Sequence, residues 1–81
     1  MNVTADELKR CIGENVRHRR KELGFSQQEV AEAAEVTQSQ IAQIESGKTS
    51  PSVEVVVKLA SFLRTEPQWF YAPKSFSPTT A

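Results

Sequence analysis

A chain of 81 residues has room for one domain with a single core, and a separate effector domain would not fit beside it. Apolar residues make up 38% of the sequence and charged residues 25%, with Gly 3 and Pro 4, a balance that excludes disordered and fibrous proteins. The formal net charge is zero, which counts against a uniformly basic nucleic-acid binder and makes the distribution of charge decisive.

Neither a membrane segment nor a disulfide is expected. The longest apolar stretch, residues 55–57, is far shorter than a membrane span, and the N-terminus lacks the apolar core of a secretory signal. Cys11 is the only cysteine, so it has no internal disulfide partner and cannot build a Cys-rich zinc site. We therefore expect a cytoplasmic protein.

The first helix is predicted from a capping signal and a periodic apolar pattern. Thr4 followed three residues later by Glu7 forms a capping box. Apolar residues then recur at helical spacing, at Leu8, Ile12, Val16 and Leu23. The helix should run to about Leu23, because Gly24 tolerates the left-handed conformation that ends many helices.

A second capping signal follows at once. Ser26 and Glu29 form a capping box, and Phe25 and Val30 hold the positions of a hydrophobic staple, so a second helix should begin at Ser26. Small residues in this helix, of which Ala31 is the most critical, fall where two helices must come close. A larger side chain at Ala31 would push them apart.

The same arrangement occurs a third time. Thr37 and Gln40 form a capping box, and Val36 can staple onto Ile41, so a third helix should run from about Gln38 to Ser46. Only residues 35–36 separate it from the helix before. A joint this tight between two stapled helices fixes their crossing and predicts a helix-turn-helix unit.

The remaining chain should close the core. After Gly47 and a short loop, Ser52 can cap a fourth helix whose inward face would carry Val53, Val56, Val57, Ala60 and Leu63. Pro67 fits the first turn of a short fifth helix. We expect residues 1–72 to form an all-α domain and residues 73–81 a flexible tail, because the tail is rich in Ser, Thr and Pro.

The third helix has an outward face without charge. With Ile41 and Ile44 inward, the opposite face holds Gln38, Ser39, Ala42, Gln43 and Ser46. Such a stripe is often no more than a solvated surface. On the second helix of a helix-turn-helix unit it instead favours entry into the DNA major groove, where Gln can grip adenine and Ala can touch a thymine methyl group. We expect base contacts from Gln38, Ser39, Ala42 and Gln43.

Affinity should come from phosphate contacts. Exposed amides at the starts of the second and third helices are anion sites, and basic residues crowd the end of the first helix. The predicted phosphate contacts are Gln27, Gln40, Lys48, Thr49, Ser50, Arg17 and Lys21. A solvated face is the alternative for the last two. His18 has no second His or Cys near it, so we expect no metal, cofactor or catalytic role.

These residues resemble the phage-repressor type of helix-turn-helix proteins, the Cro and lambda-repressor class, also called the XRE family. The resemblance covers about residues 10–71. It is carried by Ile12-Gly13, Arg20, Ser26-Gln27, Val30-Ala31, residues 37–41, residues 44–47 and Pro51-Ser52. It implies a compact five-helix fold, a homodimer on a near-palindromic DNA operator, and transcriptional control, such as repression.

The resemblance also assigns roles to single residues. Gln27 would sit on a phosphate and brace Gln38, and Arg20 and Glu45 would form a largely buried ion pair between the first and third helices. Glu35 departs from the family pattern, because the turn residue there is often Gly. A left-handed conformation at Glu35 would cost about 1–2 kcal/mol.

The dimer contact and the biological role are left with alternatives. Trp69, Phe70 and Tyr71 make an apolar end, with Phe76 as a further candidate, that we expect to form a two-fold contact, although they could instead cap the core. An antitoxin or adaptor with this fold would use it mainly to bind a protein partner, but a protein-binding face should carry aromatic or Leu anchors, and the third helix has none. An enzyme is not expected, because no catalytic motif is visible.

Overall fold

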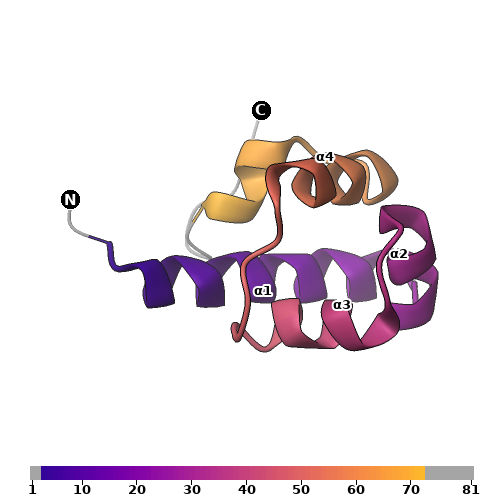
Figure 1. Cartoon of the computed structure of the whole chain (residues 1–81). Helices are drawn as coiled ribbons and strands as arrows, with labels where there is room; N and C mark the ends of the chain where they lie inside the picture. The colour runs from indigo at the N-terminus through magenta and orange to yellow at the C-terminus, as the bar shows by residue number, and fades with distance from the viewer. Residues whose placement is uncertain (1–2, 73–81) are drawn as a thin grey trace.

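The computed structural model describes residues 3–72, which form four α-helices and one 3₁₀ helix. The elements are α1 (Ala5–Glu22), α2 (Gln27–Ala34), α3 (Gln38–Glu45), α4 (Val53–Phe62) and η1 (Pro67–Tyr71). In Figure 1, α1 runs through the middle of the molecule, α3 lies along one side of it, and α4 and η1 lie on the other. The predicted all-α fold is thus confirmed, except that the fifth helix is of the 3₁₀ type. The predicted tail, residues 73–81, lies outside the described residues.

All three predicted capping boxes are present. The side-chain oxygens of Thr4, Ser26 and Thr37 each accept a hydrogen bond from the backbone amide three residues on, at 3.1, 3.0 and 3.1 Å. In turn, the backbone amides of these three capping residues donate to a side-chain oxygen of Glu7, Glu29 and Gln40, at 2.9, 2.8 and 2.8 Å. Ser52 caps α4 by accepting from the amide of Val55 at 3.2 Å. Local side-chain chemistry therefore sets where each α-helix begins.

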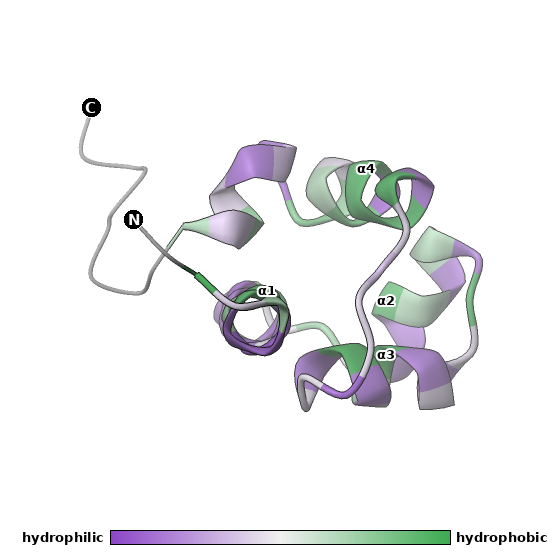
Figure 2. Cartoon of the chain, turned by 60° about the vertical axis from the view of Figure 1, so that its left-hand side comes forward, coloured by the Kyte–Doolittle hydropathy of each residue, from purple (hydrophilic) through white to green (hydrophobic). Residues whose placement is uncertain are grey.

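One core joins the five elements. Its largest fully buried side chains are Phe70, Ile41, Leu59, Leu63, Val16 and Val30. Ala31 is also fully buried, as expected for a residue at a close helix contact. Figure 2 shows the hydrophobic colour on the inner sides of α2, α3 and α4 and the hydrophilic colour on the outer side of α3. Within residues 3–72 no helix combines the length and the apolar character that crossing a membrane requires.

The inward face of α4 differs from the prediction. Val56, Ala60 and Leu63 are buried, but Val53 is 78% exposed and Val57 is 52% exposed. The helix instead buries Leu59 fully and turns Phe62 partly inward, where its ring packs on Phe25 with the ring centroids 4.5 Å apart. The burial of a leucine together with this aromatic contact outweighs the burial of two valines, which explains the rotation of α4 relative to the prediction.

The turn between α2 and α3 adopts the left-handed conformation at Glu35, with φ 61° and ψ 41°. We expect Glu35→Gly to raise the free energy of unfolding by about 1 kcal/mol, because glycine removes a strain of about 1–2 kcal/mol. The gain is reduced by loss of an exposed ion pair, since Nζ of Lys58 lies 3.1 Å from the Glu35 carboxylate. Chemical denaturation measures the change, with Lys58→Ala as the control for the ion pair. An unchanged or lower stability of Glu35→Gly would contradict the prediction.

Candidate nucleic-acid interface

The outer face of α3 is polar and carries no charge. Gln38, Ser39 and Gln43 are exposed, and Ala42 beside them is partly buried. The two isoleucines of the helix are buried, at 0% and 4% exposure, so the helix is oriented as the sequence predicted. Ser46, the residue directly after α3, is also exposed. The structure thus leaves these small and amide side chains free to meet a ligand.

A continuous chain of hydrogen bonds holds Gln38. Its Nε2 donates to Oε1 of Gln27 at 2.7 Å, and Nε2 of Gln27 donates to Oε1 of Glu45 at 3.0 Å. Glu45 accepts two further bonds from Arg20, from Nη2 to Oε1 at 3.0 Å and from Nε to Oε2 at 2.6 Å. The first residue of α3 is therefore tied through the first residue of α2 to a buried charge on α1.

The ion pair between Arg20 and Glu45, expected from the resemblance, is present and buried. The two side chains are 11% and 4% exposed. The hydrogen bonds from Arg20 to Glu45 raise the pKa of the guanidinium, against the opposing effect of its burial. Nη1 of Arg20 also donates to the backbone oxygen of Phe25 at 3.0 Å. One arginine therefore fastens α3 and the loop before α2 to α1.

The predicted phosphate contacts in the loop and on α1 are accessible. Lys48, Thr49 and Ser50 are exposed in the loop that follows α3. Arg17 and Lys21 are exposed on α1 and lie four residues apart, which places them on one side of that helix. None of these three basic residues takes part in an ion pair within the described part of the chain. Their charges are available to an anion.

The two glutamines predicted to contact phosphates, Gln27 and Gln40, already form hydrogen bonds within the protein. Gln27 is partly buried, and both the nitrogen and the oxygen of its side-chain amide form hydrogen bonds. Gln40 is exposed, but its Oε1 accepts from the backbone amide of Thr37 at 2.8 Å and closes the capping box. Only the amide nitrogen of Gln40 therefore remains for a phosphate.

The apolar end of the chain is split between core and surface. Phe70 is fully buried in the protomer, which corrects the prediction that it lies at a dimer contact. Its ring belongs to the buried core cluster, so it has no surface to offer. Tyr71 is 40% exposed and Trp69 is partly buried, so these two remain candidates for such a contact.

Two residues of α1 have structural roles that the sequence reasoning did not assign, although Gly13 was among the residues that carry the resemblance. Asn15 is buried, and its Nδ2 donates to the backbone oxygens of Phe70 at 2.8 Å and Ala72 at 2.7 Å, which fixes the end of η1 on α1. Gly13 is buried where α1 crosses α3. The position needs glycine, because a Cβ there would lie 2.8 Å from the backbone oxygen of Glu45. A polar residue and a glycine inside an otherwise periodic helix were the available signals.

His18 and Cys11 are the remaining side chains with potential for chemistry that the sequence analysis considered. His18 is exposed. The Sγ of Cys11 donates to the backbone oxygen of Ala72 at 3.1 Å, and burial, followed by the charge of Glu14, raises the pKa of this thiol. In the stretch 3–72 no three His, Cys, Asp or Glu side chains come together as a metal ligand set would require.

A helix-turn-helix family model matches residues 16–70, which is most of the described fold. The HTH-type transcriptional regulator DicA of Escherichia coli is 33% identical over 58 residues, covering 72% of this chain. This chain spans 43% of the length of DicA. The chain therefore belongs to the phage-repressor-type helix-turn-helix family, the XRE family, and its family and fold are those of DNA-binding regulators.

Solved structures support the same placement. The restriction-modification controller protein C.AhdI of Aeromonas hydrophila superposes with a TM-score of 0.74 at 27% identity, over 78% of this chain and 96% of that chain. The c2 repressor of phage P22, solved in complex with a synthetic operator, superposes with a TM-score of 0.72 at 29% identity, over 80% and 96% of the two chains. Both similarities extend over nearly the whole of the other chain.

Proposed function

We propose that this protein is a sequence-specific DNA-binding transcriptional regulator that reads the major groove with α3. The observation that carries the proposal is the uncharged outer face of this helix, on which Gln38 is exposed and held by Gln27. A glutamine amide can donate to N7 of adenine and accept from its N6, which suits a side chain whose position is already fixed. The structure of the similar P22 repressor in complex with a synthetic operator supports DNA as the ligand.

Affinity in this proposal comes from contacts that carry no sequence information. Lys48, Thr49 and Ser50 would hold the backbone beyond the end of α3, and Arg17 and Lys21 would add charge from α1. The amides at the starts of α2 and α3 would bind phosphates near Gln27 and Gln38. Because the formal net charge is zero, we expect weak binding to non-specific DNA and a strong dependence on base contacts.

Selection of bound sequences from random duplex DNA tests the proposal. The wild-type protein should enrich one sequence with A·T base pairs under Gln38 and Gln43. Gln38→Ala and Gln43→Ala should each lose about 1–3 kcal/mol of discrimination, or roughly 5-fold to 150-fold, at one base position. The matched control is Gln68→Ala, which removes an exposed glutamine from η1. Failure of the wild-type protein to enrich any sequence at low salt would contradict the proposal.

The regulator would act as a homodimer on a near-palindromic operator, with Trp69 and Tyr71 contributing to the two-fold contact. The partial exposure of these rings supports this assembly. Two bound subunits should then recognise inverted half-sites with centres about 34–36 Å apart, which is one turn of the double helix. Sedimentation of the free protein measures the dimer directly. A protein that remains monomeric at high micromolar concentration would exclude a dimer formed before DNA is bound.

A further inference from the structure

Arg10 carries a free positive charge near the end of α3. Its side chain is exposed and makes no ion pair within residues 3–72. Of the neighbouring carboxylates, Asp6 and Glu7 are engaged elsewhere, and Glu14 forms no ion pair with Arg10 within the described residues. Asp6 lies 3.7 Å from Nζ of Lys9, and Glu7 accepts from the backbone amide of Thr4 at 2.9 Å. The hydrogen bonds from Thr4, more than the charge of Arg10, lower the pKa of Glu7.

The turn of α1 that contains Arg10 packs on Gly47, which follows Ser46, the C-cap residue of α3. A Cβ on Gly47 would lie 2.9 Å from Cγ of Arg10 and 3.2 Å from its Cα. Gly47 therefore permits direct contact between the N-terminal half of α1 and the end of α3, and it also adopts φ 81°. This contact places the turn of α1 that contains Arg10 beside the start of the loop that carries Lys48, the residue that follows Gly47 in the chain.

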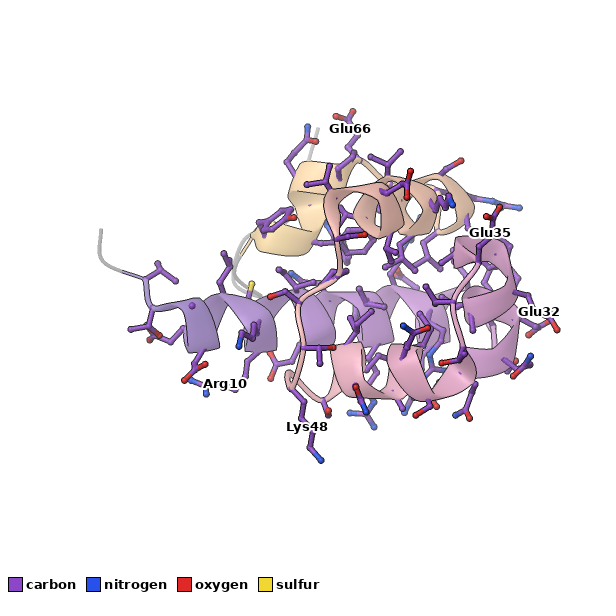
Figure 3. All side chains as sticks on the ribbon, viewed as in Figure 1. Arg10, Glu32, Glu35, Lys48 and Glu66 are labelled. Carbon is purple, nitrogen blue, oxygen red and sulfur yellow. The ribbon has the colours of Figure 1, made fainter. Side chains whose placement is uncertain are left out.

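The two cations point to the side of the molecule on which α3 lies. In Figure 3, Arg10 and Lys48 both lie below α1, on the side of the molecule that carries α3, whereas Glu32, Glu35 and Glu66 lie toward the other edges. Together with Arg17 and Lys21 of α1, these two cations outnumber the nearby carboxylates of Glu7 and Glu14, so this side attracts an anion even though the whole chain is neutral.

Arg10 also continues the basic side of α1. Arg17 and Lys21 follow it by seven and eleven residues, which are close to two and three helical turns. At a rise of about 1.5 Å per residue, this stripe is about 16 Å long. Glu14 is the acidic residue on the stripe. Arg10 lies before residue 16, where the match to the family model begins, so the matched segment does not include this contact.

We propose that Arg10 binds the phosphate backbone of the same DNA duplex that α3 reads, on the same side of the groove as Lys48. This inference rests on the proposed function. The eight residues of α3 are about 12 Å long, which is close to the width of the major groove. The backbone amides at the start of α3 would bind phosphates along one edge of the groove, and the two cations at the other end of α3 would bind phosphates along the opposite edge. Contacts at both borders fix the depth and tilt of the reading helix.

The dependence of DNA affinity on salt tests this assignment. The binding constant is measured over a series of salt concentrations with the enriched duplex, cut to about two turns or 20 base pairs. We expect Arg10→Gln to make the slope of log affinity against log salt shallower by about 0.9 for each bound subunit. The weakening should be similar on a duplex of mixed sequence, and the enriched sequence should not change, because a phosphate contact is blind to sequence.

Two further variants serve as controls. Arg10→Lys keeps the charge and should keep the slope. Arg64→Gln removes another exposed arginine without an ion pair, after α4 on the side of the molecule away from α3, and should also keep the slope. An Arg10→Gln slope equal to that of the wild type, or an equal change for Arg64→Gln, would overturn the inference while the proposed function stands. A wild-type protein that binds neither duplex at low salt would overturn both.

Discussion

Glu45→Ala is expected to lower the free energy of unfolding by about 3–5 kcal/mol, because it leaves Arg20 buried without its counter-charge. The loss also frees the amide nitrogen of Gln27, which donates to the same carboxylate. For a domain of this size, the melting temperature should fall by at least about 12 °C. Thermal unfolding followed by circular dichroism measures the change.

Two variants separate the effect of the buried charge from that of a lost side chain. Glu32→Ala removes an exposed carboxylate and should change stability by less than about 0.5 kcal/mol. The double variant Arg20→Met with Glu45→Leu should be more stable than Glu45→Ala, since neither charge is then left unpaired. A melting temperature of Glu45→Ala within experimental error of the wild type would show that the pair contributes nothing to stability.

Gly13→Ala should destabilise the protein by about 1–3 kcal/mol, although alanine normally favours a helix by about 0.5–1 kcal/mol over glycine. The new Cβ would lie 2.8 Å from the backbone oxygen of Glu45 and closer still to that of Ile44. Both obstacles are backbone atoms of α3, so α1 and α3 must move apart. Because this movement would pull Glu45 away from Arg20, operator affinity should fall together with stability.

Chemical denaturation and DNA titration of the same preparation test this prediction. His18→Ala, at an exposed position on α1, is the control and should change stability by less than about 0.5 kcal/mol. A Gly13→Ala protein that is more stable than the wild type would mean that the two helices do not need this close approach. Helix propensity would then be the larger effect.

Features set by neighbouring residues could be predicted from the sequence. The starts of α1, α2 and α3 follow from capping boxes, in which side chain and backbone are three residues apart and need no other part of the fold. The short joint between α2 and α3 followed from the small separation of two such boxes, and the left-handed turn at Glu35 was expected from the family resemblance, in which that residue is often Gly. The orientation of α3 followed from its two isoleucines, because no other face of that helix is apolar.

Features set by tertiary packing could not be predicted in the same way. Helix α4 has apolar residues around more than half of its circumference, so periodicity alone did not decide between Val57 and Phe62 for the core. The burial of Phe70 depends on space left by other helices, and the position of Arg10 depends on the crossing of α1 with α3. Residues distant in the sequence decide each of these cases.

The hydrogen bonds that connect Arg20 with Gln38 converge on the carboxylate of Glu45, toward which the donors on both sides point. A carboxylate can accept but not donate, so Glu45 obliges Gln27 to turn its amide nitrogen inward and its oxygen toward α3. Gln38 must then give one amide hydrogen to Gln27, and its other amide hydrogen and its oxygen remain free for a ligand. The arrangement of donor and acceptor at the start of α3 is thus determined by a carboxylate inside the protein.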